Sequence, residues 1–214
     1  MNAFTTFVFT PAGLGHADLA IAASRAGAVG IYNAEFDDGT AAARQALARL
    51  AQLGRGDIGL KLDAIDDALD SDVALLAARR GGLWMVVDLP LLATHAGVVA
   101  GWRQAGVRVL AEVRHATALP AGAEAQIDGL VVKGNEAPGL VGEDASFILL
   151  QKWLRATTLP LVLRGGLTPA VAAAIHAVGA AGGVLESQLL LLDEVRLPDL
   201  LRQTLGSLSG SETV

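Results

Sequence analysis

The sequence contains no cysteine and few aromatic residues. The absence of cysteine excludes disulfides, thiolate metal ligands and a cysteine nucleophile, and it is consistent with a cytoplasmic protein. Aromatic residues make up 4% of the chain, which disfavours a stacking platform for single-stranded nucleic acid. Because no basic cluster occurs and the formal net charge is −6, we expect no nucleic-acid partner.

Long apolar runs are also absent. No run approaches the roughly 18–20 residues that a membrane span needs, and no basic segment leads into a hydrophobic one as in a secretion signal. We therefore expect no membrane partner. In contrast, 52% of the 214 residues are hydrophobic, enough for the core of one large domain, which we place at residues 1–205. The small, polar residues 206–214 predict a flexible tail or a linker to further domains of a larger protein.

Short apolar segments alternate with alanine- and leucine-rich segments along the whole chain. The expected strands cover residues 7–10, 29–33, 58–62, 83–87, 107–113, 127–132, 159–163 and 184–185. The expected helices cover residues 17–26, 40–53, 71–80, 94–105, 146–155, a segment from 169 onward and 190–205, with a weak helix or loop at 115–126. Eight such units predict a compact (β/α)8 TIM barrel of parallel strands. An open doubly wound sheet is the alternative, although its Gly-x-Gly-x-x-Gly fingerprint after the first strand is absent.

Two glycine pairs flank the seventh helix. Gly165 and Gly166 follow the seventh strand, Thr168 can cap the next helix, and Gly182 and Gly183 precede the last strand. A helix start with free backbone N–H groups attracts phosphate, and barrels commonly bind phosphate after strands seven and eight. The two pairs therefore predict a phosphate site, or else two ordinary turns with nothing bound.

Several titratable residues lie at predicted strand ends, where barrel enzymes place their chemistry. Lys133 ends the sixth strand and Glu136 follows on a glycine-flanked loop, so the two either contact a ligand or form a surface salt bridge. Asp88 and Glu112 are either a carboxylate pair for acid–base catalysis or caps of neighbouring helices. His115 is the one histidine that follows a strand end. No histidine pair has the spacing of a metal site, so we expect no bound metal.

Four segments of the chain resemble one family. They are Thr10-Pro-Ala-Gly13, Val132-Lys-Gly-Asn-Glu-Ala-Pro-Gly139, Leu163-Arg-Gly-Gly-Leu167 and Gly179-Ala-Ala-Gly-Gly-Val-Leu-Glu-Ser-Gln-Leu189. Together they are similar to the nitronate monooxygenase (2-nitropropane dioxygenase-like) family of FMN-dependent TIM barrels. Within this family, the sequence as a whole most resembles the versions found inside polyketide and polyunsaturated fatty acid synthases. Those versions resemble flavin enoyl reductases that act on carrier-bound acyl chains.

The resemblance implies an FMN cofactor at the carboxyl ends of the strands. The residues that it places around the cofactor are Pro11, Ala12, Gly13, Lys61, Lys133, Gly165, Gly166, Gly182, Gly183 and Ser187. Lys133, Asn135 and Glu136 would lie beside the flavin or substrate, and His115 joins them as a catalytic candidate from its strand-end position.

Three departures from the family pattern put part of this in doubt. Leu140 stands where nitronate-oxidising members have a catalytic histidine, and Pro138 stands where a glycine is usual. The extra helical segment that covers the family's active site has no counterpart here. Nitronate oxidation is therefore in question, water exclusion would have to come from elsewhere, and the flavin itself could have been lost.

These observations leave three functional hypotheses. The first is an FMN-dependent oxidoreductase domain that acts on a carrier-bound acyl thioester or another small molecule, beside neighbouring synthase domains. The second is a catalytically inactive barrel that serves as a scaffold or docking domain. The third is a phosphate-handling isomerase or aldolase, with Lys61 or Lys133 as an amine nucleophile.

Overall fold

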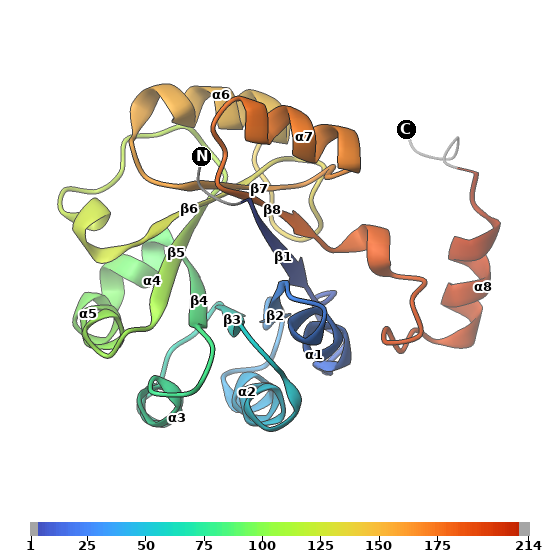
Figure 1. The fold of residues 1–214 in the computed structure, drawn as a ribbon, viewed down its shortest axis with the longest axis horizontal. Helices are drawn as coiled ribbons and strands as arrows, with labels where there is room; N and C mark the ends of the chain where they lie inside the picture. The colour runs from blue at the N-terminus through green and yellow to red at the C-terminus, as the bar shows by residue number, and fades with distance from the viewer. Residues whose placement is uncertain (1–3, 210–214) are drawn as a thin grey trace.

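The computed structural model describes residues 4–209, which form a closed barrel of eight parallel strands (Figure 1). The strands are β1 (Thr5–Phe9), β2 (Val29–Asn33), β3 (Ile58–Leu62), β4 (Leu83–Asp88), β5 (Arg108–Val113), β6 (Gly129–Lys133), β7 (Leu161–Arg164) and β8 (Gly182–Leu185). The barrel closes because β8 pairs with β1, from Thr5 opposite Gly182 to Val8 opposite Leu185. The predicted (β/α)8 fold is confirmed, and the open sheet is wrong.

Helices surround the strands on the outside of the barrel (Figure 1). They are α1 (Asp18–Arg25), α2 (Ala41–Leu53), α3 (Asp67–Leu76), α4 (Leu89–Thr94), α5 (Ala96–Gln104), α6 (Ser146–Ala156), α7 (Pro169–Ala177) and α8 (Asp199–Ser207), with short 3-10 turns η1 (Ala123–Gln126) and η2 (Ser187–Leu189). The predicted cap of α7 is confirmed, because the Thr168 side chain accepts from the Val171 amide at 3.2 Å. No helix among residues 4–209 is long and apolar enough to cross a membrane.

Two helices begin earlier than the sequence predicted, and in each case an aspartate cap explains the difference. Asp66 accepts from the Leu69 amide at 2.7 Å, so α3 begins at Asp67 and not at 71. Asp88 accepts from the Leu91 amide at 2.9 Å, so a helix starts directly after β4. The predicted helix at 94–105 is therefore two helices, α4 and α5.

The predicted helix at 190–205 is also wrong in its bounds. The chain forms the turn η2 first, and α8 begins only after Pro198, whose missing N–H suits a helix start. Because α8 runs to Ser207, the first two residues of the predicted tail are helical, while residues 210–214 lie outside the described part. Figure 1 shows α8 at the side of the barrel, and none of its residues is buried.

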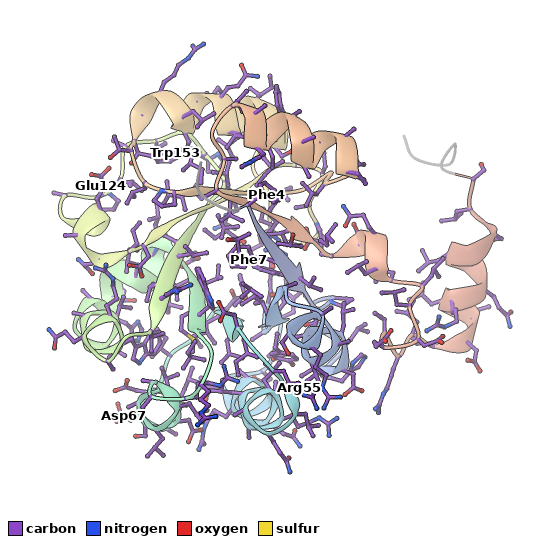
Figure 2. All side chains as sticks on the ribbon, in the orientation of Figure 1. Phe4, Phe7, Arg55, Asp67, Glu124 and Trp153 are labelled. Atoms are coloured by element: carbon purple, nitrogen blue, oxygen red, sulfur yellow. The ribbon has the colours of Figure 1, made fainter. Side chains whose placement is uncertain are left out.

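The barrel interior is apolar over most of its depth. Its buried cluster consists of Phe7, Phe9, Val29, Ile31, Trp84, Val86, Leu110, Val131, Val162 and Val184. Phe7 lies inside the ring of strands (Figure 2) and meets Trp84 edge-on, with ring centroids 5.2 Å apart. Around the ring, Gly30 allows α1 to pack closely on β2, since a Cβ there would lie 1.9 Å from the Ala20 carbonyl oxygen. Towards the carboxyl ends of the strands, the interior changes from apolar to charged.

Candidate functional site

Six charged side chains fill the carboxyl end of the barrel, and we call them the mouth network. They are Glu35, Lys61, Glu112, Lys133, Arg164 and Glu186, each 5% exposed or less. Lys61, Glu112, Lys133 and Arg164 come from strand ends, whereas Glu35 and Glu186 follow β2 and β8. Three side chains are acidic and three are basic, so the formal charges cancel. Such a network is tolerable in a buried place because each charge has an opposite partner.

Arg164 joins two of the carboxylates. Its Nη1 lies 2.6 Å from Glu112 Oε2, and its Nε and Nη2 lie 3.1 and 2.8 Å from Glu186 Oε2. The guanidinium also stacks over Phe9, 4.9 Å from the ring centroid. Burial alone would lower the pKa of Arg164, but Glu112 and Glu186 outweigh burial and raise it. Arg164 therefore remains a fixed cation within the barrel.

Lys133 lies between two other carboxylates. Its Nζ is 3.3 Å from Glu35 Oε2 and 3.7 Å from Glu112 Oε1. Burial lowers the pKa of Lys133, and these two carboxylates oppose that shift only in part. Lys61 contacts Asp63 and lies 3.9 Å from Glu35. Both predicted lysines thus face the mouth, but neither amine is free for a ligand in this arrangement.

Glu35 ties the two sides of the mouth together. Its Oε1 accepts a hydrogen bond from the Leu140 amide at 2.9 Å. This bond joins the loop after β2 to the loop after β6, and these two strands lie on opposite sides of the ring. Burial would raise the pKa of Glu35, but the Leu140 N–H, Lys61, Lys133 and Arg164 together lower it.

Residues 134–145, which we call the strap, cross the mouth at this contact. A Cβ at Gly139 would lie 2.3 Å from Glu35 Oε1, so the strap closes tightly over the network.

One oxygen of the network has no partner. Glu186 Oε2 binds Arg164, but Glu186 Oε1 is buried and accepts no hydrogen bond from the described residues. Burial raises the pKa of Glu186, and the attraction of Arg164 offsets the shift only partly. Glu186 and Glu35 are therefore shifted in opposite directions within the same network.

The other catalytic candidates serve the strap and not the mouth. Glu136 accepts a hydrogen bond from the Ser146 amide at 2.8 Å and so satisfies the first N–H of α6. Lys133 pairs with Glu35 and Glu112. The Lys133–Glu136 salt bridge, one of the two alternatives from the sequence, is therefore wrong. The Asn135 side chain donates to the Glu143 carbonyl at 2.9 Å. His115 is exposed on the β5 loop. Among these four candidates, the structure brings only Lys133 into the mouth.

The candidates Asp88 and Glu112 bind different partners. Asp88 caps α4, as the capping interpretation expected. Glu112 lies opposite Asp88 in the β4–β5 register, but it caps no helix and pairs with Arg164 and Lys133 instead.

The loops after β7 and β8 form a second region, which we call the glycine corner: Gly165, Gly166, Ser187 and Gln188. Gln188 holds the two loops together, because its Nε2 donates to the Leu167 carbonyl at 2.9 Å and its Oε1 accepts from the Glu186 amide at 3.0 Å. Gly166 and Ser187 are exposed. In residues 4–209 no protein acceptor receives the Gly166 amide or the Ser187 hydroxyl.

The glycines of the two pairs have different roles. Gly165 and Gly166 have φ of 116° and 62°, which favour glycine, and a Cβ at Gly166 would meet nothing within 4 Å. At Gly183 a Cβ would lie 2.8 Å from Leu167 Cδ2, and at Gly182 it would lie 2.4 Å from the Thr5 carbonyl oxygen. Gly166 therefore shapes an exposed loop, Gly165 is buried where a Cβ would lie 3.2 Å from the Ala137 amide nitrogen, and the second pair permits close packing of β8.

The predicted loop under the cofactor lies beside this corner, because β1 neighbours β8. Pro11 and Ala12 are half-buried, and Gly13 is exposed with φ of 74°.

The chemistry of the corner fits a phosphate: two hydrogen-bond donors without a partner in the described part of the chain lie on adjacent loops, on the exposed residues Gly166 and Ser187. No group of His, Asp or Glu side chains within residues 4–209 could hold a metal ion.

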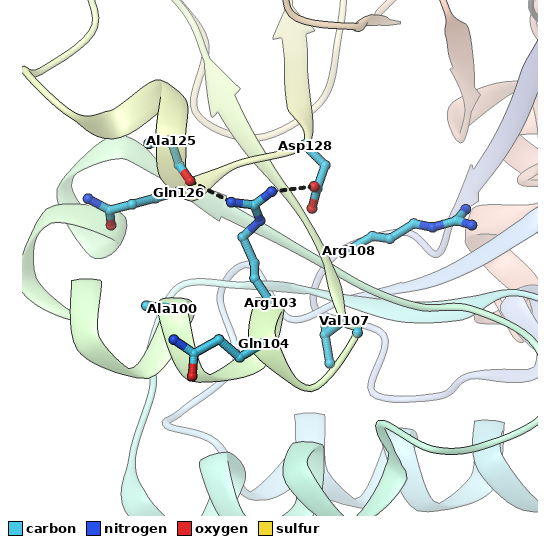
Figure 3. A pocket seen from close by; sticks show the side chains of 9 residues that line it. Ala100, Arg103, Gln104, Val107, Arg108, Ala125, Gln126 and Asp128 are labelled. Atoms are coloured by element: carbon cyan, nitrogen blue, oxygen red, sulfur yellow. Dashed lines mark hydrogen bonds and ion pairs between the residues drawn. The ribbon is translucent and has the colours of Figure 1, made fainter.

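One surface hollow lies away from the mouth. The hollow in Figure 3, about 500 Å³, opens near the amino-terminal ends of the strands between α5 and η1. Arg103 and Asp128 line it and bind each other at 2.8 Å. No residue of the mouth network or glycine corner lines this hollow.

Fold and site together define the class of protein, a (β/α)8 barrel with a charged, covered mouth. Comparison with solved structures supports the fold. FabK from Thermotoga maritima has a TM-score of 0.79 at 21% identity, over 100% of this chain and 67% of that one. Nitroalkane oxidase from Streptomyces ansochromogenes has a TM-score of 0.73 at 21% identity, over 95% and 71%. Mandelate oxidase with a C4a-OH-FMN adduct has a TM-score of 0.63 at 14% identity, over 94% and 70%. No protein-family model and no curated protein matches the chain.

Proposed function

We propose that this chain is an FMN-dependent oxidoreductase domain that reduces an acyl-thioester double bond, in the manner of an enoyl reductase, within a polyketide or fatty-acid synthase. The observation that carries the proposal is the glycine corner, whose exposed donors remain unsatisfied beside a mouth where nearly every group has a partner. The resemblance of four segments to FMN barrels supports it. So does the likeness of fold to a mandelate oxidase that carries an FMN adduct.

In this proposal the chain's own residues bind the cofactor and shield the mouth from water. The Gly166 amide and the Ser187 hydroxyl hold the phosphate, and Pro11, Ala12 and Gly13 border the same corner. Bound FMN supplies the hydride chemistry. Lys61 and Lys133 keep positive charge at the mouth, where they can stabilise negative charge that develops on a substrate oxygen.

The strap takes the place of the missing helical cover. It lies over the charged side chains and excludes water from them, which strengthens electrostatic interactions below it. A substrate carbonyl reaches Lys133 only when the Leu140–Glu35 hydrogen bond opens. The proposal therefore requires the strap to move, and substrate binding has to supply the free energy that opens it.

Flavin titration tests the phosphate site directly. FMN added to the protein should lose fluorescence on binding, and riboflavin, which lacks the phosphate, should bind more weakly. Ser187→Glu places a carboxylate at the corner and should weaken FMN binding at least about tenfold through charge repulsion. Gln52→Glu, a change at an exposed residue on α2, should leave binding unchanged. Equal affinity for riboflavin and FMN would contradict the phosphate site, and the absence of any FMN binding would reject the flavin proposal.

One observation favours the second candidate, a catalytically inactive barrel that serves as a scaffold or docking domain. The six charges of the mouth network neutralise one another under the strap, so none is left to act on a substrate in this state. An assay of turnover with FMN, a reduced nicotinamide and crotonyl-CoA distinguishes the two candidates. Turnover in the wild type and its loss in Ser187→Glu would exclude the inactive barrel. The isomerase or aldolase hypothesis stays a prediction; it requires Lys61 or Lys133 to leave its salt bridges.

A further inference from the structure

Three loops at the mouth carry acidic side chains and no basic ones. Residues 34–40, 63–67 and 134–145 contain nine aspartates and glutamates and no lysine, arginine or histidine. Their formal charge of −9 exceeds the −6 of the whole chain, so the remainder of the molecule is net basic. Glu35 is buried in the mouth network, and Asp63 and Asp144 pair with Lys61 and Lys152. Most of the others are exposed, so these loops present negative charge to solvent.

Large apolar side chains are exposed among these acids. The chain has nine aromatic residues, all of which the structure describes, and only Phe36 and Phe147 are more than a third exposed, at 64% and 40%. Leu140, Ile148 and Val141 are exposed by 60%, 48% and 39%. We call these five side chains the collar. Exposed apolar groups gathered in one region of a protein surface commonly mark an interaction site.

The collar residues are held together by hydrogen bonds of the loops that carry them. Glu35, next to Phe36, accepts from the Leu140 amide at 2.9 Å. Glu136 in the strap accepts from the Ser146 amide at 2.8 Å, and Ser146 immediately precedes Phe147 and Ile148. The strap, which itself carries Leu140 and Val141, is therefore tied to the loop that carries Phe36 and to the start of α6 that carries Phe147 and Ile148.

The backbone of Phe36 is a second indication. Its φ is 74°, and it is the one non-glycine residue among residues 4–209 with a positive φ. A bulky aromatic residue is disfavoured in this conformation, and such strain persists where the fold or a function requires it. Here the strained residue directs a phenylalanine into solvent, where it makes little compensating contact.

We propose that the collar and its acidic surroundings form a docking surface for a basic amphipathic helix of another protein domain. Exposed apolar anchors carried on or beside acidic loops are complementary to a helix with leucine-like residues on one face and lysines or arginines beside them. The negative loops would speed association with such a helix and repel acidic partners. This proposal does not depend on flavin binding, because the glycine corner contributes nothing to the surface.

Peptide binding tests the proposal with the intact chain. The probe is a fluorescent amphipathic helix of leucine and lysine, measured by anisotropy at low ionic strength, and the control is the same pattern with glutamate in place of lysine. The lysine peptide should bind and weaken with salt, and the glutamate peptide should not bind. The double variant Phe36→Ser, Leu140→Ser should bind the lysine peptide about tenfold more weakly, because it removes two exposed anchors.

A matched variant separates the collar from non-specific attraction by the net charge. Leu75→Ser, Leu200→Ser removes two leucines that are 81% and 77% exposed but lie on α3 and α8; it should keep wild-type affinity. Equal loss in both double variants, or equal binding of the glutamate peptide, would overturn the proposal. Vesicles of anionic lipid should not bind; capture that depends on Phe36 and Leu140 would make the collar a membrane site instead. Urea unfolding checks that both variants remain folded.

Discussion

The mouth network and the glycine corner lie at the same end of the barrel, yet they differ in whether their polar groups have partners. In the network every charged group has an opposite charge nearby, and only Glu186 Oε1 lacks a bond. In the corner the Gly166 amide and the Ser187 hydroxyl have no partner among residues 4–209, and both residues are exposed. The comparison shows that a charged residue at a strand end is not by itself available to a ligand.

Energetics explains why the two regions can differ so much. A buried charge costs several kcal/mol to desolvate unless it is paired, so the charged groups of the network have to pair with one another beneath the strap. An exposed amide costs little without a protein partner, since water accepts its hydrogen bond. A phosphate at the corner replaces only water, whereas a ligand at the mouth has to displace the strap and compete with existing salt bridges.

The largest expected effect comes from breaking the network at its centre. Arg164→Met leaves Glu112 and Glu186 buried without their shared cation, and we expect it to lower the free energy of unfolding by about 3–5 kcal/mol. Lys152→Met, which removes a partly exposed ion pair with Asp144, should cost no more than about 1 kcal/mol. Urea unfolding at pH 7 measures both.

A second change makes the Arg164 experiment specific. Arg164→Met, Glu186→Gln removes one of the two stranded carboxylates, so it should be more stable than Arg164→Met alone. If the double variant is less stable than the single one, the stranded charge is not the cause of the loss.

A pair of glycines with positive φ compares the two regions. Gly139 and Gly166 have φ of 86° and 62°, so alanine costs about 1–2 kcal/mol at either place. At Gly139 the new Cβ would also lie 2.3 Å from Glu35 Oε1, whereas at Gly166 it would meet nothing within 4 Å. Gly139→Ala should therefore be less stable than Gly166→Ala by a further 1–3 kcal/mol or so. Equal stabilities in urea would show that the strap does not press on Glu35.

The fold was predictable because its signal is repeated eight times. Continuous apolar runs such as Ile58–Leu62 fit strands buried on both faces, and alternation with alanine-rich segments fixes the parallel barrel. Element bounds were less predictable where a side-chain cap decided them. Asp66 and Asp88 begin α3 and α4 earlier than the apolar pattern alone suggested.

The site was predictable in part. Lys133 was placed at the mouth because it ends an apolar strand, but its partner Glu35 is 98 residues away, and no local pattern reveals that pairing. A usable signal did exist in the alternation of the strands. Glu112 and Arg164 each follow an interior residue by two positions, Leu110 and Val162, and so face the barrel axis. Extending the period of two to the strand ends would have predicted that Arg164 and Glu112 both face the mouth.

The smallest expected effect is a dependence on pH that has opposite signs for two carboxylates of the same network. The pKa of Glu35 is lowered by the fold, so its charge stabilises the protein above its ordinary value of 4.5, and this contribution is lost as the pH falls through the folded pKa. The pKa of Glu186 is raised by burial, so its contribution is fully present below 4.5 and is lost as the pH rises through the folded pKa. On acidification from pH 7 to pH 3, the stability of the wild type should therefore fall relative to Glu35→Gln and rise relative to Glu186→Gln. Chemical unfolding of the three proteins across this range measures both differences, and the same sign for both would mean that the network titrates as one group rather than as two opposed ones.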